Sequence, residues 1–292
     1  MTVAVVIPSF NRRHWLVQTL PTYRSVRGIS EIIIVDDGSQ DGTHELVQDS
    51  SREDPRIKLV RHTRNKGLPA ARNSGADAAE SEFVCYGEDE VVFEPDYVET
   101  LVRHLEEQRA DIIAGPRAPI ESYESRGEAL QRYVQATSTH IPWHLDYRFA
   151  LPTDVDVEWP FLSACALIRR NVATRLRYDE GLIGNFYREE GDFYLRALAA
   201  GHRLVYCPHT ACYHYVVDRS MDRGGCHSRS KFRTGLFSVA NNWRYVRRNQ
   251  QALARYSFPN PVLLQAAFVA ENGRKAAFAL ARRFGLASQR VH

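Results

Sequence analysis

The sequence lacks the features that mark disulfide-rich, zinc-finger and membrane-spanning proteins. Its five cysteines include no Cys-x-x-Cys pair, so neither a disulfide framework nor a zinc cluster is indicated. They are Cys85, Cys165, Cys207, Cys212 and Cys226. No apolar run approaches the roughly 20 residues that span a bilayer, and no basic leader precedes the apolar run Val3–Ile7. We therefore expect a cytoplasmic protein with reduced cysteines, at most peripheral to a membrane.

The net charge of +3 conceals an uneven distribution. Residues 217–292 contain 14 Lys and Arg against 3 Asp and Glu, a balance of +11, which leaves −8 for residues 1–216. A basic segment opposite an acidic body suits an anionic ligand held between them, or a contact with anionic lipid or nucleic acid. A solvated basic tail is the alternative.

The acidic run Glu88-Asp89-Glu90 directly follows the apolar stretch Phe83–Tyr86. Three like charges at the end of a strand repel one another, and a divalent cation is the usual way to offset that repulsion. Carboxylate oxygens suit Mg²⁺ or Mn²⁺. On this stretch alone, a solvated acidic turn is an equally good interpretation.

Apolar, β-prone runs predict buried parallel strands. They lie at residues 3–7, 32–35, 57–60 and 83–86. Helical periodicity between them predicts helices over 13–26, from 41 onward, and over 70–79. At 292 residues the chain is long enough for one large α/β domain or two small ones. We expect an α/β fold with an open, mostly parallel sheet flanked by helices.

Polar residues follow several of these strands. Asn11, Asp36, Asp37 and the acidic run all stand where a predicted strand ends. In open parallel sheets, ligands bind beyond the carboxyl ends of the strands, so these positions predict a binding site.

The second half of the chain is less regular. Its pattern predicts helices over 95–109, 129–135, 189–198, 235–248 and 262–284, strands over 111–115, 161–168, 204–206 and 212–215, and a mobile loop over 218–231. The last helix can pack on the body, form a homodimer or lie on a membrane surface, and the sequence does not choose between these.

Six motifs, in this order, resemble a family-2 glycosyltransferase of GT-A fold, over roughly residues 3–215. They are Val6–Arg12, Ile34–Thr43, Asn65–Gly75, Glu88–Glu90, Glu189–Arg196 and Pro208–His214. The resemblance implies a GT-A catalytic domain over 1–215, with a nucleotide-sugar-binding half at 1–115 and an acceptor-binding half at 116–215. A mobile basic loop and a helical C-terminal extension would follow over 216–292.

The resemblance also implies which residues hold the nucleotide of the donor. They are Pro8, Ser9, Phe10, Asn11, Arg12, Asp36, Asp37, Arg72, Glu88 and Asp89. Alternatives remain for three of them, because Asp36 or Asp37 can instead form an Asx turn before Gly38. Arg72 can instead pair with Asp77 on the surface of a helix.

The acidic run stands where the family has its Asp-x-Asp metal motif. By position Glu90 matches the metal ligand, while Glu88 would face the ribose, or the metal through water. His214 would complete the coordination of Mn²⁺ or Mg²⁺. Two glutamates replace the usual aspartates, so the metal's position and requirement stay open, and a lone His at a strand end can be merely structural.

Glu190 occupies the position of the family's catalytic base, where Asp is more usual. A carboxylate there would take the proton from an acceptor hydroxyl or amine, with inversion in a single displacement. Compensation of the helix dipole is the alternative, which Glu189 and Asp192 can supply equally. Glu189 is the second candidate base, Asp192 a candidate acceptor-binding acid, and Trp159 either stacks on an acceptor ring or belongs to the core.

Three cations follow the predicted loop and can fold over the diphosphate of the donor, which would exclude water. They are Arg229, Lys231 and Arg233.

We therefore predict an inverting, metal-assisted glycosyltransferase with a nucleoside diphosphate sugar donor, an unknown acceptor and no nucleic-acid partner. A non-catalytic nucleotide-sugar-binding relative is the first alternative, because both acidic motifs carry Glu for Asp. A nucleotidyltransferase is the second. It usually has a glycine-rich phosphate loop near its N-terminus, and Pro8-Ser9-Phe10-Asn11 offers none.

Overall fold

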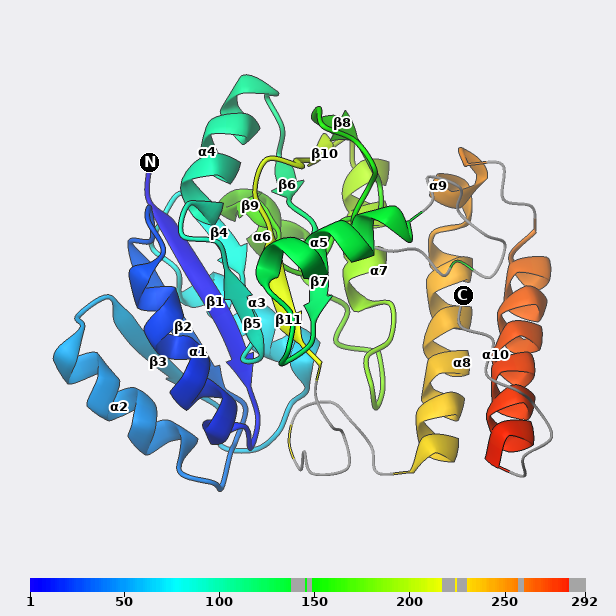
Figure 1. The fold of residues 1–292 in the computed structure, drawn as a ribbon, viewed down its shortest axis with the longest axis horizontal. Coiled ribbons are helices and arrows are strands. Elements are labelled where there is room, and N and C mark those ends of the chain that lie inside the picture. Colours follow the sequence, from blue (N-terminus) through cyan, green and yellow to red (C-terminus); the bar gives the residue numbers. More distant parts are fainter. Residues whose placement is uncertain (138–144, 146–148, 217–223, 225–229, 257–259, 284–292) are drawn as a thin grey trace.

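The computed structural model describes all residues except 138–144, 146–148, 217–223, 225–229, 257–259 and 284–292 (Figure 1). Its centre is an eight-stranded sheet. In spatial order the strands are β3 (Ile57–Arg61), β2 (Glu31–Asp36), β1 (Val3–Ser9), β4 (Phe83–Tyr86), β9 (Leu167–Arg169), β6 (Ile112–Ala114), β10 (Leu204–Tyr206) and β8 (Val157–Glu158). Only β9 and β8 run against the direction of the other strands.

A second, three-stranded sheet stands beside the first. Its strands, in spatial order, are β5 (Val91–Phe93), β11 (Cys212–Tyr215) and β7 (Arg117–Ile120). Because β5 follows β4 after only four residues, the acidic run forms the corner between the two sheets.

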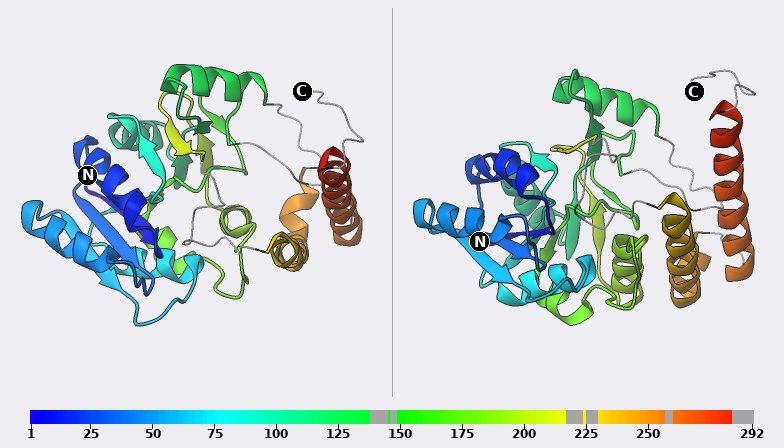
Figure 2. Two further views of the ribbon diagram at one scale, coloured as in Figure 1. Left: turned by 60° about the horizontal axis from the view of Figure 1, so that its bottom comes forward. Right: turned by 90° about the horizontal axis from the view of Figure 1, so that it is seen from below.

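Most helices flank the large sheet, one packs on the small sheet, and the last three described helices extend the molecule at one end (Figures 1 and 2). They are α1 (Arg13–Ser25), α2 (Thr43–Glu53), α3 (Leu68–Ala78), α4 (Tyr97–Glu107), α5 (Arg126–Gln135), α6 (Arg170–Leu176), α7 (Glu189–Ala199), α8 (Lys231–Arg248), α9 (Gln250–Ala254) and α10 (Pro261–Arg283). None of these described helices has both the length and the apolar character needed to cross a bilayer.

Both faces of the central strands are buried, as their continuous apolar sequences predict. Every residue of β1 and β2 is buried. Val5 and Ile7 pack with α1 and α4 on one face, whereas Ala4 and Val6 pack with α3, α6 and α7 on the other. This double burial fixes the register of the strands and hence the position of the loops that leave their carboxyl ends.

The C-terminal helices are bound to the loop that leads into α7. Asp179 accepts hydrogen bonds from Arg244 and Arg248 of α8, the latter at 2.8 Å. Arg188 donates to Asn242 of α8 at 3.1 Å, and Asn242 in turn contacts α10. The helical extension predicted from the sequence is therefore packed on the body. The predicted homodimer or membrane contact through these helices stays a prediction.

One predicted strand is wrong over most of its length. Residues 161–166 are buried but belong to no strand, and only Leu167–Arg169 pairs as β9. Two carbonyls of this stretch accept hydrogen bonds from tyrosine side chains instead of a neighbouring strand: Ser163 from Tyr194 at 2.6 Å and Cys165 from Tyr97 at 2.8 Å. A run of apolar residues does not show whether its backbone will pair with a neighbouring strand or with side chains.

Candidate functional site

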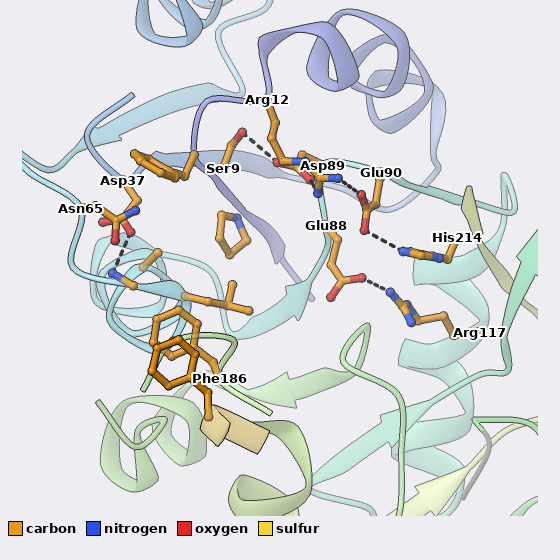
Figure 3. A pocket seen from close by; sticks show the side chains of 17 residues that line it. Ser9, Arg12, Asp37, Asn65, Glu88, Asp89, Glu90, Arg117, Phe186 and His214 are labelled. Atoms are coloured by element: carbon orange, nitrogen blue, oxygen red, sulfur yellow. Dashed lines mark hydrogen bonds and ion pairs between the residues drawn. The ribbon is translucent and has the colours of Figure 1, made fainter. Parts of the chain in front are cut away.

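A pocket of about 630 Å³ opens at the carboxyl ends of β1, β2 and β4 (Figure 3). This is the edge of the sheet at which ligands of open parallel sheets bind. Its lining residues are Pro8, Ser9, Phe10, Arg12, Asp37, Asn65, Gly67, Leu68, Ala71, Glu88, Asp89, Glu90, Arg117, Gly184, Phe186, His214 and Phe237. Most of the predicted nucleotide-binding residues and both predicted metal ligands are among them.

Asp89 and Glu90 share one buried guanidinium. Arg12, which is 5% exposed, donates from Nη1 to Asp89 at 2.8 Å and from Nη2 to Glu90. Ser9 donates a further hydrogen bond to Asp89 at 2.9 Å. Burial raises the pKa of Asp89 to about 7, with Arg12 opposing that rise and the neighbouring Glu90 adding to it. The acidic corner is thus compensated by cations of the protein rather than exposed to solvent.

Glu90 and His214 both line the pocket and contact each other. Glu90 Oε1 lies 2.7 Å from His214 Nε2, which β11 places opposite the acidic corner (Figure 3). Burial alone would raise the pKa of Glu90, but the hydrogen bond with His214 and the charge of Arg12 lower it to about 2. Glu90 is therefore ionised at neutral pH.

Glu88 is held by two arginines from different parts of the chain. Arg117 of β7 and Arg72 of α3 both donate to its carboxylate, Arg72 at 3.2 Å. Burial opposes ionisation of Glu88, but Arg117 and Arg72 outweigh it and lower its pKa. The first acid of the motif is thus an anion between two cations.

Arg72 does not line the pocket but lies behind it. It is fully buried and donates from Nε to Glu189 at 3.0 Å, so it joins the acidic corner to the first turn of α7. The alternative pairing with Asp77 on a helix surface is wrong, because Asp77 pairs with Arg177 at 2.8 Å. Burial raises the pKa of Glu189 to about 8 despite the charge of Arg72.

The two aspartates after β2 have different surroundings. Asp37 lines the pocket and accepts hydrogen bonds from the backbone of Lys66 and Gly67, both at 2.8 Å, which shapes the entry to α3. Asp36 is fully buried outside the pocket lining and accepts from the backbone of Ser39 at 2.8 Å, the Asx-type turn given above as its alternative.

Asn11 also lies outside the pocket lining and connects two loops. Its backbone φ is 52°, and its side chain accepts a hydrogen bond from the backbone of Gln40 at 2.8 Å. Gly224, a described residue of the segment after β11, lies against the carbonyls of Phe10 and Asn11 so closely that a Cβ would overlap both. Gly224 therefore lies beside Phe10, a residue that lines the pocket.

The three acids in the first turn of α7 differ in how they are held. Glu189 is tied to Arg72, and Asp192 is buried and accepts hydrogen bonds from Arg196 at 2.8 Å and Asn249 at 2.9 Å. Glu190 is half-buried and forms no hydrogen bond or ion pair with any residue that the structure describes. Of the three, Glu190 is the one whose carboxylate is not committed to a partner.

Trp159 and Arg233, two further predicted residues, do not line the pocket. Trp159 is half-buried and packs edge-to-face on Phe161, with ring centroids 6.0 Å apart, between two hydrophobic clusters. Lys231 is the first residue of α8, and Arg233, two residues later in the same turn, is exposed. Arg229 and most of the predicted mobile loop lie outside the described residues.

Sequence reasoning missed the second wall of the pocket. Phe186 packs against Gly67, whose φ is 94°, and a Cβ on Gly67 would come within 2.5 Å of the Phe186 ring. Phe237 of α8 and Arg117 of β7 complete the wall. Gly67 stands inside a motif quoted above, but Arg117 falls in a region without a clear pattern, and nothing local to Phe237 points to a pocket so distant in the chain.

Comparison with known proteins shows several similarities. The sequence matches the model for the family "Glycosyl transferase family 2" over residues 4–177. Glycosyltransferase GlyA of Streptococcus pneumoniae serotype 4 is 34% identical over 118 residues, which are 39% of this chain and 16% of that protein. EpsH of Bacillus subtilis is 26% identical over 252 residues, 85% of this chain and 70% of EpsH.

The fold is shared with a solved structure. The crystal structure of S. aureus TarS in complex with UDP-GlcNAc matches with a TM-score of 0.60 at 16% identity, and covers 88% of this chain and 71% of the TarS chain. The predicted fold class, an α/β sheet flanked by helices with a helical C-terminal extension, is thereby confirmed.

Proposed function

The chain belongs to glycosyl transferase family 2, as its motifs predicted, and from that premise we propose that it transfers a sugar from a nucleoside diphosphate sugar to an acceptor. The observation that carries the proposal is the pocket at the carboxyl ends of β1, β2 and β4, which brings Asp37, the acidic corner and His214 together. Its volume of about 630 Å³ lies within the range of small-molecule sites.

We assign the nucleoside to the part of the pocket between Pro8–Phe10 and Asn65–Leu68, and the diphosphate to the part beside Glu90 and His214. Uridine diphosphate sugars are the first donors to test, because S. aureus TarS, which has the same fold, forms complexes with UDP and UDP-GlcNAc. The donor would thus be bound mainly by residues 1–115, and the acceptor by residues 116–215, which contribute Phe186 and His214 to the pocket.

The pair Glu90 and His214 fits a divalent cation. One ionised carboxylate and one imidazole, 2.7 Å apart at the pocket wall, form a donor set that accepts Mn²⁺ and, less readily, Mg²⁺. Two protein ligands leave positions for diphosphate oxygens and water, as is usual for these ions at phosphate sites. When bound, the cation would neutralise charge that develops on the leaving diphosphate.

We assign the role of base to Glu190. Glu189 is engaged by Arg72 and Asp192 by Arg196, whereas Glu190 has no partner among the described residues. The acceptor oxygen would form its bond to the anomeric carbon of the donor while its proton passes to Glu190. The bond between that carbon and the diphosphate oxygen breaks on the opposite face, its electron pair leaves with the diphosphate, and the configuration inverts.

Donor binding is tested by the unfolding temperature of the purified chain with nucleoside diphosphates and their sugars, with and without Mn²⁺. A ligand at about 100 times its Kd stabilises the native state by about 2.7 kcal/mol. We expect one nucleotide series to raise the unfolding temperature, and more so with Mn²⁺. If no nucleoside diphosphate raises it, the proposal fails.

Catalysis is tested by release of nucleoside diphosphate from the bound donor with water as acceptor. Glu190→Gln should lower that rate by about 100-fold or more without weakening donor binding. The control is Glu53→Gln, since Glu53 forms a surface ion pair with Arg24 away from the pocket. Donor binding without any release in the unmodified chain would instead identify a non-catalytic relative.

A further inference from the structure

A group of metal-binding side chains lies outside the pocket. Nδ1 or Nε2 of His104, a carboxylate oxygen of Asp156 and Sγ of Cys207 lie within 4.8 Å of one another. His209 joins them, with Nε2 3.6 Å from Asp156 Oδ1 and its ring stacked on that of His104 at a centroid distance of 4.5 Å. None of the four lines the pocket. We propose that these side chains bind a zinc ion.

The distances fit a tetrahedral site. Bonds of about 2.0–2.3 Å to nitrogen, oxygen and sulfur place neighbouring ligand atoms roughly 3.3–3.8 Å apart. The separation of 3.6 Å between His209 and Asp156 already has that value, and His104 Nδ1 lies 2.7 Å from Asp156 Oδ2. The ligand atoms of His104, Asp156 and Cys207 lie within 4.8 Å of one another, so shifts of about 1 Å, which side-chain rotation supplies, would bring these three to such separations.

A second observation points to a ligand rather than to a closed hydrogen-bonded group. The Asp156 side chain is only 5% exposed, and its Oδ2 accepts hydrogen bonds from His104 and from Gln108 at 3.2 Å. Its Oδ1 is buried and accepts no hydrogen bond from any described residue. A buried carboxylate oxygen without a donor costs free energy unless a cation takes that place, and Oδ1 is directed towards His209.

The donor set selects zinc over the ions proposed for the pocket. A thiolate with two imidazoles and one carboxylate suits Zn²⁺, whereas Mg²⁺ prefers oxygen ligands and keeps water. His104 would bind the ion through Nδ1. The contact of 3.3 Å between its Nε2 and the guanidinium of the exposed Arg103 would then be lost. The sequence carries no Cys-x-x-Cys signature for this site because its ligands come from three separate segments.

The ion would join parts of the chain that are distant in sequence. His104 lies near the end of α4, Asp156 precedes the two-residue strand β8, and Cys207 and His209 follow β10. His104 and Asp156 are 52 residues apart, so one ion would connect the residue before β8 to the end of α4. We therefore assign it a structural role, in which all four positions are filled by protein.

Cobalt substitution of the full chain tests the proposal without altering the fold. Co²⁺ bound to a thiolate gives a charge-transfer band in the near ultraviolet. No cysteine among the described residues lines the pocket, so we expect the band from Cys207, and its loss in Cys207→Ser tests that assignment. We expect a tetrahedral Co²⁺ spectrum with this band, and its displacement by one equivalent of Zn²⁺. A chain that binds Co²⁺ without the band, or binds none, overturns the site.

Variants and stability give the second test. Cys207→Ser and Asp156→Asn should lose the band and the rise of roughly 5 °C or more in unfolding temperature that saturating Zn²⁺ produces in the unmodified chain. Cys85→Ser is the matched control, because Cys85 is equally buried but outside the group, and it should keep both. His214→Ala should keep both as well, which separates this site from the pocket. Retention of band and shift in Cys207→Ser overturns the proposal.

Discussion

Arg12 is the counter-charge of the acidic corner, and its replacement by Met should destabilise the protein strongly. The side chains of Arg12, Asp89 and Glu90 are 6%, 6% and 9% exposed, so solvent screens their charges little. Met keeps the length and the apolar stem of Arg12 but removes the guanidinium. Two adjacent carboxylates would then be buried without the cation that joins them.

The expected loss is large compared with that of a surface ion pair. Removing one partner of a buried ion pair costs roughly 3–5 kcal/mol, and we expect a loss of this size at pH 8. The loss should shrink as the pH falls towards 5. Without Arg12 the folded-state pKa values of Asp89 and Glu90 rise, and a group with a raised folded pKa contributes stability at low pH that is lost as the pH rises through that pKa.

Urea unfolding at pH 8 and pH 5 measures both effects. The control is Arg52→Met, whose partner Asp49 is exposed, and which should change the free energy of unfolding by less than about 1 kcal/mol. Mn²⁺ should stabilise Arg12→Met more than the unmodified chain, because the cation replaces the missing charge. If Arg12→Met is within about 1 kcal/mol of the unmodified chain at pH 8, Arg12 does not hold the corner together.

Three further changes test other parts of the site. Burial raises the pKa of Glu189 from 4.5 to about 8, so its stabilising contribution is complete below about 4.5 and is lost as the pH rises to 8, by about 1.4 kcal/mol per pH unit in that window. Glu189→Gln should remove this loss in urea unfolding between pH 5 and 9, and parallel profiles would contradict it. Gly67→Ala should weaken nucleotide binding and lower stability by about 1 kcal/mol or more, because its φ is 94° and its Cβ meets Phe186, whereas Gly127→Ala, with open space around it, should not. His214→Ala should weaken Mn²⁺ binding by about tenfold or more in calorimetric titration, and unchanged affinity would remove His214 as a ligand.

The part of the pocket formed by β1, β2 and β4, to which we assign the nucleotide, is predictable from sequence because local patterns determine it. Continuous apolar runs fix β1, β2 and β4, and the polar residues that end them must then meet at one edge of the sheet. Asp37 and Glu90 were located in this way. His214 required the resemblance as well, since β11 belongs to a separate sheet.

Sequence patterns do not predict which arginines pair with the acidic residues of the site. Arg72 and Glu189 are 117 residues apart, and Arg117 reaches Glu88 from a second sheet whose strand contains a proline, Pro119. Such pairs depend on how the elements pack, and an arginine in a sequence does not show which carboxylate it will meet. The same holds for Phe237, which α8 brings to the pocket from beyond the predicted catalytic domain.

The attachment of α8 to the loop before α7 has a consequence for the order in which the protein matures. Asp179 and Asp192 take hydrogen-bond partners from Arg244 and Asn249, which leave the ribosome some 60 residues later, several seconds at ordinary rates of synthesis. The strands β1, β2 and β4, whose carboxyl ends form the pocket, are synthesised well before then. We expect a nascent chain to form this edge of the sheet first, and to organise the turn that carries Glu190 only when α8 emerges.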